Sequence, residues 1–184
     1  MARHALEALL KVAHSFIDDE PKPNLHIGEA MSCWMYYGML KEAVTFEQIG
    51  LNSTKDPELL NMIEKSMAGA NSQANRLERF MRTEGIQLPP VSEPKPESNP
   101  DEIPYGAKMT DDEIANAVSI KLYAAITFCA TSAAQSVRND VGLMFLEFQV
   151  EAMKYGALLK SIMKKRGWLK QPPPYVPPGA PKLQ

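Results

Sequence analysis

The sequence has few of the residues and motifs on which most catalytic proteins depend. Its 184 residues include two cysteines and three histidines, and no Ser-His-Asp set, phosphate-binding loop or Rossmann glycine pattern is recognisable. Cys33 and Cys129 stand in apolar segments without C-x-x-C spacing. We therefore predict two buried free thiols, and a disulfide or a nucleophilic cysteine is less favoured. No catalytic residue is assigned, and the sequence favours a protein that is not an enzyme.

An excess of charge of one sign is also missing. The chain has 20 Lys and Arg against 22 Asp and Glu, a net charge of −2. Such a balance provides no field that would attract nucleic acid or an anionic membrane surface. Basic residues cluster only in "KKRGWLK", Lys164 to Lys170. Cations stabilise the C-terminal end of a helix, so we interpret this cluster as a helix cap, with nucleic-acid binding a remote alternative.

A secretion signal and a membrane-spanning run are both lacking. The opening "MARHALEALL" is interrupted by His4 and Glu7, and no continuous apolar stretch follows it. The longest uncharged run, Leu122 to Val137, falls short of the ~20 residues that a membrane span needs, and it contains Thr, Ser and Gln. We expect no signal peptide, no transmembrane segment and a cytoplasmic protein.

What the sequence does contain is helical periodicity, which proline and glycine divide into an N-terminal segment and four longer blocks. Apolar residues recur at steps of three and four in each block. No block shows a sustained period of two, so the predicted fold class is all-α. The expected helices cover approximately residues 3–17, 25–49, 57–83, 110–138 and 140–162.

Local signals support several of the helix ends. Pro57 occupies a typical first-turn position, and Gly85 is a candidate C-terminal cap. Thr110 and Glu113 form a capping box, and Asp140 is the expected N-cap of the last helix.

The lengths of the connections predict the topology. The first and second long helices, and likewise the third and fourth, are joined by short turns, so each pair should be antiparallel. Between the pairs lie the proline-rich residues 85–109. A helix of roughly 26 residues is ~39 Å long, and about half of an extended proline-rich loop of this size covers that distance. The loop can therefore cross the whole bundle, which predicts an up-down-down-up four-helix bundle of the ferritin-like type.

In their order along the chain, five segments resemble the bacterial DUF3231 family of uncharacterised, spore-coat-like proteins. They are "LHIGEAMSCWMYY", "LPPVSEPKPESNPDEIP", "TDDEIAN", "SVRNDVGLMFLEFQ" and "KKRGWLKQPPPYVPPG". The resemblance covers residues from about 25 to 179. It implies a ferritin-like bundle and a link to spore-forming bacteria, hence a cytoplasmic or spore-associated protein whose partners include other spore-associated proteins. It implies no agreed catalytic residues.

The ferritin-like fold raises the question of a metal centre. A di-iron site takes a Glu from each of two helices and a Glu-x-x-His from each of the other two. No Glu-x-x-His occurs in this chain, and we expect no cofactor. A single metal ion has four weak candidate ligands, in two pairs that each lie one helical turn apart: His26 with Glu29, and Glu147 with Glu151. We favour structural roles for all four, as helix-terminal groups for the first pair and with Lys154 as the partner of Glu151.

We expect a single domain over residues 1–184, with an N-terminal helix at 3–17, a bundle at 25–168 with its crossover at 85–109, and a proline-rich tail at 169–184. The tail resembles a polyproline ligand, and it could equally be strapped over the bundle end by Trp168 and Tyr175. Trp34, Tyr36 and Tyr37 surround the first long helix with aromatic rings, so we expect burial on more than one side and a homodimer that involves this helix or the N-terminal segment.

Two functions are consistent with these features. The favoured one is a non-catalytic structural or interaction protein associated with the spore. The alternative is a ligand- or metal-binding ferritin-like protein with a reduced site near His26.

Overall fold

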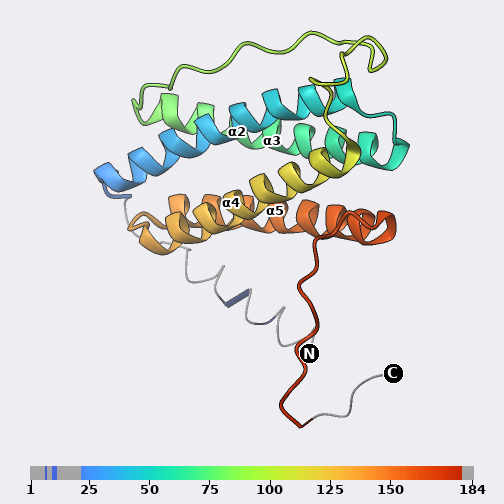
Figure 1. Ribbon diagram of the computed structural model, residues 1–184. Coiled ribbons are helices and arrows are strands. Elements are labelled where there is room, and N and C mark those ends of the chain that lie inside the picture. The colour runs from blue at the N-terminus through green and yellow to red at the C-terminus, as the bar shows by residue number, and fades with distance from the viewer. Residues whose placement is uncertain (1–6, 8–9, 12–21, 180–184) are drawn as a thin grey trace.

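The computed structural model describes residues 22–179 and, before them, Glu7, Leu10 and Lys11. Four long helices make up the described fold (Figure 1), and the described residues contain no strand. The helices are α2 (Ile27–Ser53), α3 (Pro57–Thr83), α4 (Asp111–Gln135) and α5 (Asn139–Arg166). The all-α prediction is confirmed. The expected helix at residues 3–17 lies largely outside the described residues.

Contacts at the two ends of the bundle establish the predicted topology. At one end, the Thr54 hydroxyl donates a hydrogen bond of 2.6 Å to Asp111, which brings the beginnings of α3 and α4 together. At the other end, the Arg138 guanidinium donates two bonds of 2.8 Å to Glu84, which brings the end of α3 to the beginning of α5. Helices α3 and α4 therefore run in the same direction, and the up-down-down-up ferritin-like bundle is confirmed.

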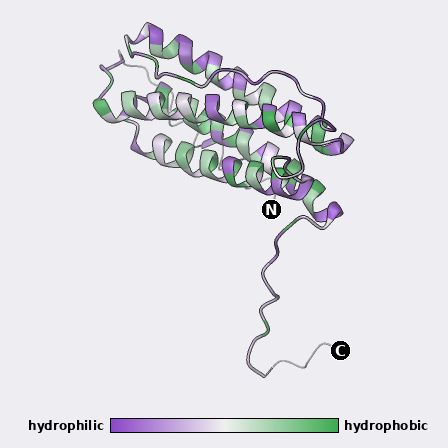
Figure 2. Ribbon diagram, turned by 45° about the horizontal axis from the view of Figure 1, so that its top comes forward, coloured by the Kyte–Doolittle hydropathy of each residue, from purple (hydrophilic) through white to green (hydrophobic). Residues whose placement is uncertain are grey.

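The crossover between α3 and α4 runs along the outside of α2 as an extended chain (Figure 1). Side chains of α2 hold it in place: Gln48 accepts a bond from the backbone N–H of Lys95, and Asn52 bonds to the backbone of both Pro96 and Ser98. Figure 2 shows that strongly hydrophobic residues are sparse along this segment, whereas hydrophobic and hydrophilic residues alternate in the helices. Most of the crossover is a strap on the surface, and only residues near its two ends, Ile86, Leu88 and Met109, pack against the core clusters.

The helix ends follow the predicted signals in three places and differ in two. Pro57 follows the N-cap Asp56, Thr110 and Glu113 form the expected capping box, and Gly85 adopts a positive φ of 73° after α3. The expected end of α2 near Ile49 was wrong. The helix continues through Gly50 to Ser53. A Cβ at Gly50 would lie only 3.2 Å from Ile114, so this glycine allows close packing and does not end the helix.

Asp140 was also predicted wrongly as the N-cap of α5. The N-cap is Arg138, and Asp140 lies inside the first turn, where it accepts bonds from the Arg138 guanidinium and from Lys22. These contacts, led by the hydrogen bond from Arg138, hold the pKa of Asp140 well below its ordinary value. The backbone N–H groups of Val137 and Arg138, which precede α5, donate to the carboxylate of Glu29.

The buried side chains form two separate clusters along the bundle. The first contains four aromatic rings, of Tyr36, Phe128, Phe145 and Phe148, in stacked and edge-to-face pairs whose centroids lie 5.6–6.3 Å apart. The second is aliphatic and includes Leu59, Ile63 and Ile114. Cys33 and Cys129 are free and fully buried, as predicted, and burial raises the pKa of both thiols to about 12.

The basic cluster at the end of α5 pairs with the acidic beginnings of two other helices. At the beginning of α3, Lys165 pairs with Glu58, and Arg166 pairs with both Glu58 and the N-cap Asp56. Lys170 pairs with Asp112 in the first turn of α4. Gly167 ends α5 in a left-handed conformation, and Trp168 packs against the aliphatic cluster. Tyr175 is 83% exposed on a tail that leads away from the bundle (Figure 1), so its predicted strapping role was wrong.

Candidate functional site

The four residues named as weak ligand candidates lie in two different environments, and each has a partner within the protein. His26 is the N-cap of α2, where its Nδ1 accepts bonds from the N–H groups of Gly28 and Glu29. Glu29 is 2% exposed, and its carboxylate accepts from the N–H groups of His26, Val137 and Arg138 at 3.1, 2.8 and 2.7 Å. This carboxylate therefore caps its own helix and the beginning of α5 at once.

Glu147 and Glu151 contact α3 rather than Lys154, the partner expected from the sequence. Glu147 pairs with Arg76 on the surface, and Glu151 accepts a bond of 2.6 Å from the Gln73 amide. Gln73 in turn accepts a bond of 2.9 Å from the Tyr36 hydroxyl, so a chain of hydrogen bonds links α2, α3 and α5 through the core. Among the described residues, no three His, Cys, Asp or Glu side chains gather as a metal site would require.

The polar centre of the bundle is Glu47 on α2, which sequence reasoning overlooked. Its side chain is almost fully buried, at 4% exposed, and its Oε1 accepts a bond of 2.6 Å from the Ser66 hydroxyl. Burial is the main cause that raises the pKa of this carboxyl to about 7, and the Ser66 bond and the charge of Lys121 oppose the rise. The signal for this residue was present, because the apolar stripe of Cys33, Leu40 and Val44 reaches position 47 at its next step.

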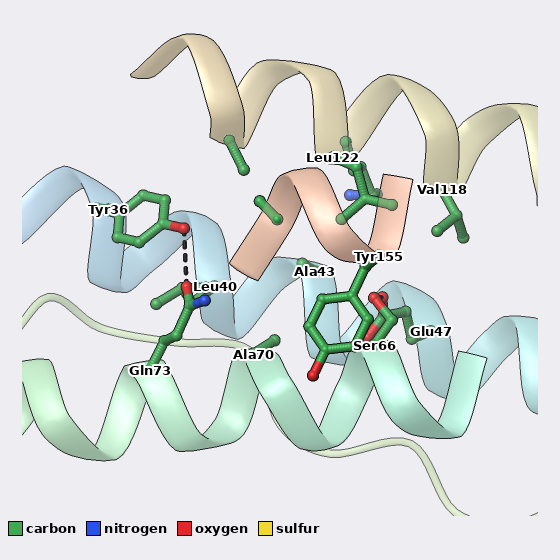
Figure 3. Close-up of a pocket in the computed structure, with 13 residues that line it drawn as sticks. Tyr36, Leu40, Ala43, Glu47, Ser66, Ala70, Gln73, Val118, Leu122 and Tyr155 are labelled. Carbon is green, nitrogen blue, oxygen red and sulfur yellow. Dashed lines mark hydrogen bonds between the residues drawn. The ribbon is translucent and has the colours of Figure 1, made fainter. Parts of the chain in front are cut away.

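A cavity of about 50 Å³ adjoins Glu47 between the two hydrophobic clusters. Figure 3 shows Glu47, Ser66 and Tyr155 at one end of this space and the Tyr36–Gln73 pair at the other. Apart from Lys121, the rest of the wall is aliphatic, from small and medium side chains such as Leu40, Ala70 and Leu122. The site can thus offer one carboxyl group to a small molecule in an otherwise mostly apolar space.

The outer surface of α4 is the second unusual feature. This helix is long and apolar enough to cross a membrane by length and composition alone, and 22% of its apolar window is buried. In the bundle it packs mainly against α5 and less closely against α2. Ile120 and Tyr123 are 69% and 72% exposed on its outer side. An exposed apolar surface of this kind typically marks an interaction site.

Comparisons with known proteins agree with the observed fold. The chain is 28% identical over 155 residues to the uncharacterised protein YvdQ of Bacillus subtilis (strain 168), an alignment that covers 84% of this chain and 89% of YvdQ. It is 31% identical to a provisionally assigned spore coat protein from Bacillus halodurans C-125, whose crystal structure superposes with a TM-score of 0.81 over 86% of this chain and 98% of that one.

A more distant match shares the fold alone. It is a two-domain protein of Anabaena variabilis with DJ-1/ThiJ/PfpI-like and ferritin-like domains, with 15% identity and a TM-score of 0.60 over 83% of this chain and 41% of that one. The strongest assignment comes from the family comparison, in which residues 15–180 match DUF3231, described as a protein of unknown function. Together with the bundle topology, this match shows that the chain belongs to the DUF3231 family.

Proposed function

We propose that this protein is a non-catalytic structural or interaction protein of the spore that works as a homodimer through the outer faces of α2 and α4. One observation carries the proposal. Helix α4 has no charged residue between Leu122 and Val137, yet only 22% of its apolar window is buried within the part of the chain that the structure describes. In water such a surface favours association with another apolar surface.

The composition of this surface suits a second copy of the chain. Ala124, Thr127, Thr131 and Ala134 are exposed along α4, and such small side chains allow two helices to approach closely. On α2, Met31 and Met35 are 53% and 45% exposed. A two-fold axis places the same patch on both sides of an interface, so an uncharged patch meets no like charge there.

The remaining parts of the proposal have separate support. The four candidate ligand residues have protein partners, which favours structural roles for them. The similarity to a provisionally assigned spore coat protein supports a place in the spore.

Sedimentation equilibrium with two charge-introducing variants tests the dimer. We expect the purified protein to sediment as a dimer, and Met35→Lys and Thr127→Lys each to weaken association at least tenfold, because a buried lysine without a partner opposes the interface. Val150→Lys on α5 is the matched control, since Val150 is 49% exposed on a helix outside the proposed interface. A monomeric wild type, or dissociation by Val150→Lys alone, would contradict the proposed interface.

The place in the spore is tested in sporulating cells of the source organism. A fluorescent fusion should collect at the forespore surface, and the untagged protein should be recovered from purified spores in the coat fraction. A fusion that stays evenly distributed in the mother cell, with no protein in extracted coats, would rule out this part of the proposal.

A further inference from the structure

Glu47 has a buried oxygen atom with no partner, and this is the starting point of the inference. Its Oε1 is bonded to Ser66, but Oε2 has no hydrogen bond, the only such buried side-chain oxygen or nitrogen in the described part of the chain. Buried carboxyl groups are normally paired or fully hydrogen-bonded, because removing them from water without compensation is costly. The free oxygen therefore indicates a missing hydrogen-bond donor.

The cavity beside Glu47 adjoins a larger groove. This groove has a volume of about 290 Å³ and lies between α2 and α4. The cavity and the groove share five lining residues, Tyr36, Leu40, Ala43, Lys121 and Ala125. Met39 and Ala124 extend the apolar wall of the groove, and Glu42 lies at its polar edge. A molecule with a polar head of a few atoms and an apolar body can therefore place its head at Glu47 and its body in the groove.

The polar groups of the cavity restrict which chemical class of head group can bind there. The hydroxyl donors of Ser66 and Tyr36 and one N–H of the Gln73 amide are already used within the protein, and the unpartnered atom is the carboxyl oxygen Oε2 of Glu47. A divalent metal ion would need more ligands than the described residues bring together. A primary ammonium needs only acceptors, and it neutralises a buried carboxylate directly.

We propose that the cavity at Glu47 binds the ammonium head of a small primary amine, with the apolar part of the amine in the groove between α2 and α4. Lys121 is the other charged group that lines the cavity, and its ammonium lies 4.7 Å from the centroid of the Phe46 ring. Tyr155 and Tyr36 line the same space from α5 and α2, and the polar side chains that α3 contributes are the non-titrating Ser66 and Gln73. Lys121 makes no hydrogen bond to Glu47, so Oε2 stays open to the ammonium of a ligand.

Calorimetric titration with n-alkylamines of four to eight carbons tests the proposal, and 1-alkanols and alkanoates of equal length serve as comparison ligands. We expect amines to bind with sub-millimolar affinity and to release protons at neutral pH, because the ammonium favours the ionised form of Glu47. Amine affinity should fall about tenfold for each pH unit below 7. Alkanols should bind at least tenfold more weakly, and alkanoates should not bind.

Three variants complete the test. Glu47→Gln should weaken amine binding at least tenfold, whereas Glu64→Gln, the same change at an exposed glutamate of α3, should leave it unchanged. Ala125→Phe should block the path between groove and cavity without altering Glu47. The groove opens on the α2–α4 face, which the proposed dimer would cover. Repeating the titration with Thr127→Lys, which should weaken the dimer, therefore tests amine binding separately from dimer formation. Absent amine binding in both wild type and Thr127→Lys, equal binding by Glu47→Gln, or equal affinity for alkanols would overturn the proposal.

Discussion

Glu29 shows how a single buried carboxylate can hold two helices in register. Its two oxygens accept three backbone N–H groups, one from the start of α2 and two from the turn before α5, 108 and 109 residues further along the chain. Hydrogen bonds to an ionised acceptor are stronger than those between neutral groups. The residue therefore acts as a cap for α5 that the sequence around α5 does not contain.

This role predicts a clear difference between two of the candidate ligand residues. Glu29→Ala should lower the free energy of unfolding by about 2–3 kcal/mol, because it leaves buried N–H groups without a partner. Glu147→Ala removes an exposed ion pair and should cost less than about 1 kcal/mol. Urea denaturation in the presence of EDTA measures both values without a contribution from metal ions. Equal costs for the two variants would argue against the capping role of Glu29.

Glu47 predicts a dependence of stability on pH. Its pKa is raised from 4.5 to about 7 in the folded protein, mainly by burial, so the folded state binds more protons than the unfolded state between these values. The contribution of Glu47 to stability therefore declines as pH rises from about 5 to above 7, by roughly 1–3 kcal/mol in total.

The check for Glu47 is a comparison of unfolding curves between pH 5 and pH 8. Glu47→Gln, which does not titrate, should lose less stability than the wild type over this range. Parallel pH profiles for the two proteins would show that Glu47 is not the titrating group. Asp140 has the opposite shift, so its stabilising contribution is lost only as the solution becomes strongly acidic, below its ordinary value of 3.8.

At the scale of the helices, three glycines illustrate different uses of a missing side chain. Gly50 and Gly69 lie in close contacts: a Cβ at Gly69 would lie 2.6 Å from the Tyr155 ring, whereas the nearest atom to a Cβ at Gly38 is 4.0 Å away. All three lie inside helices, where glycine is about 1 kcal/mol less favourable than alanine.

Gly38→Ala should therefore raise the free energy of unfolding by roughly 0.5–1 kcal/mol. Gly69→Ala should show no such gain, because the new methyl group displaces Tyr155 from the cavity wall. Thermal denaturation of both variants provides the comparison. If the two substitutions stabilise equally, the contact between Gly69 and Tyr155 is not a constraint.

The helices themselves could be predicted largely from the sequence, because an amphipathic period, Pro57 at a first turn and the Thr110–Glu113 capping box are all local signals. The errors arose where a distant residue decides the outcome. Gly50 lies inside α2 and is packed closely by Ile114, and Asp140 lies inside α5, whose N-cap Arg138 donates its N–H to Glu29 on a distant helix. The ligand candidates were named by spacing alone, whereas the cavity depends on Ser66, Gln73 and Tyr155, which only the packing of three helices brings to Glu47.

At the scale of the whole molecule, the crossover decides the topology. The extended length of the crossover exceeds the length of a helix, and this comparison was sufficient to predict from the sequence that α3 and α4 are parallel. Its anchoring by Gln48 and Asn52 was not predictable, because side-chain bonds to an extended backbone leave no periodic pattern.

Shortening the crossover tests directly whether its length is needed for the parallel arrangement of α3 and α4. A linker of ten residues reaches at most ~36 Å, which is less than the ~40 Å length of α3, so a single subunit could not form the native bundle. A Gly/Ser linker of the native length should retain the helical circular dichroism and the cooperative unfolding, at lower stability because α2 no longer holds the strap. Size-exclusion chromatography should show aggregation or exchange of helices between subunits for the short linker only. A compact, cooperatively unfolding subunit with the short linker would contradict the crossover topology.

The cavity at the centre of the bundle also determines how the protein responds to compression. If its 50 Å³ is eliminated on unfolding, it accounts for roughly 30 mL/mol of volume decrease, a substantial share of the change typical for a small protein. Hydrostatic pressure should therefore unfold this bundle more readily than one with a filled centre. An amine bound at Glu47 would occupy the void and reduce that sensitivity, so the volume change of unfolding reports whether the space is filled.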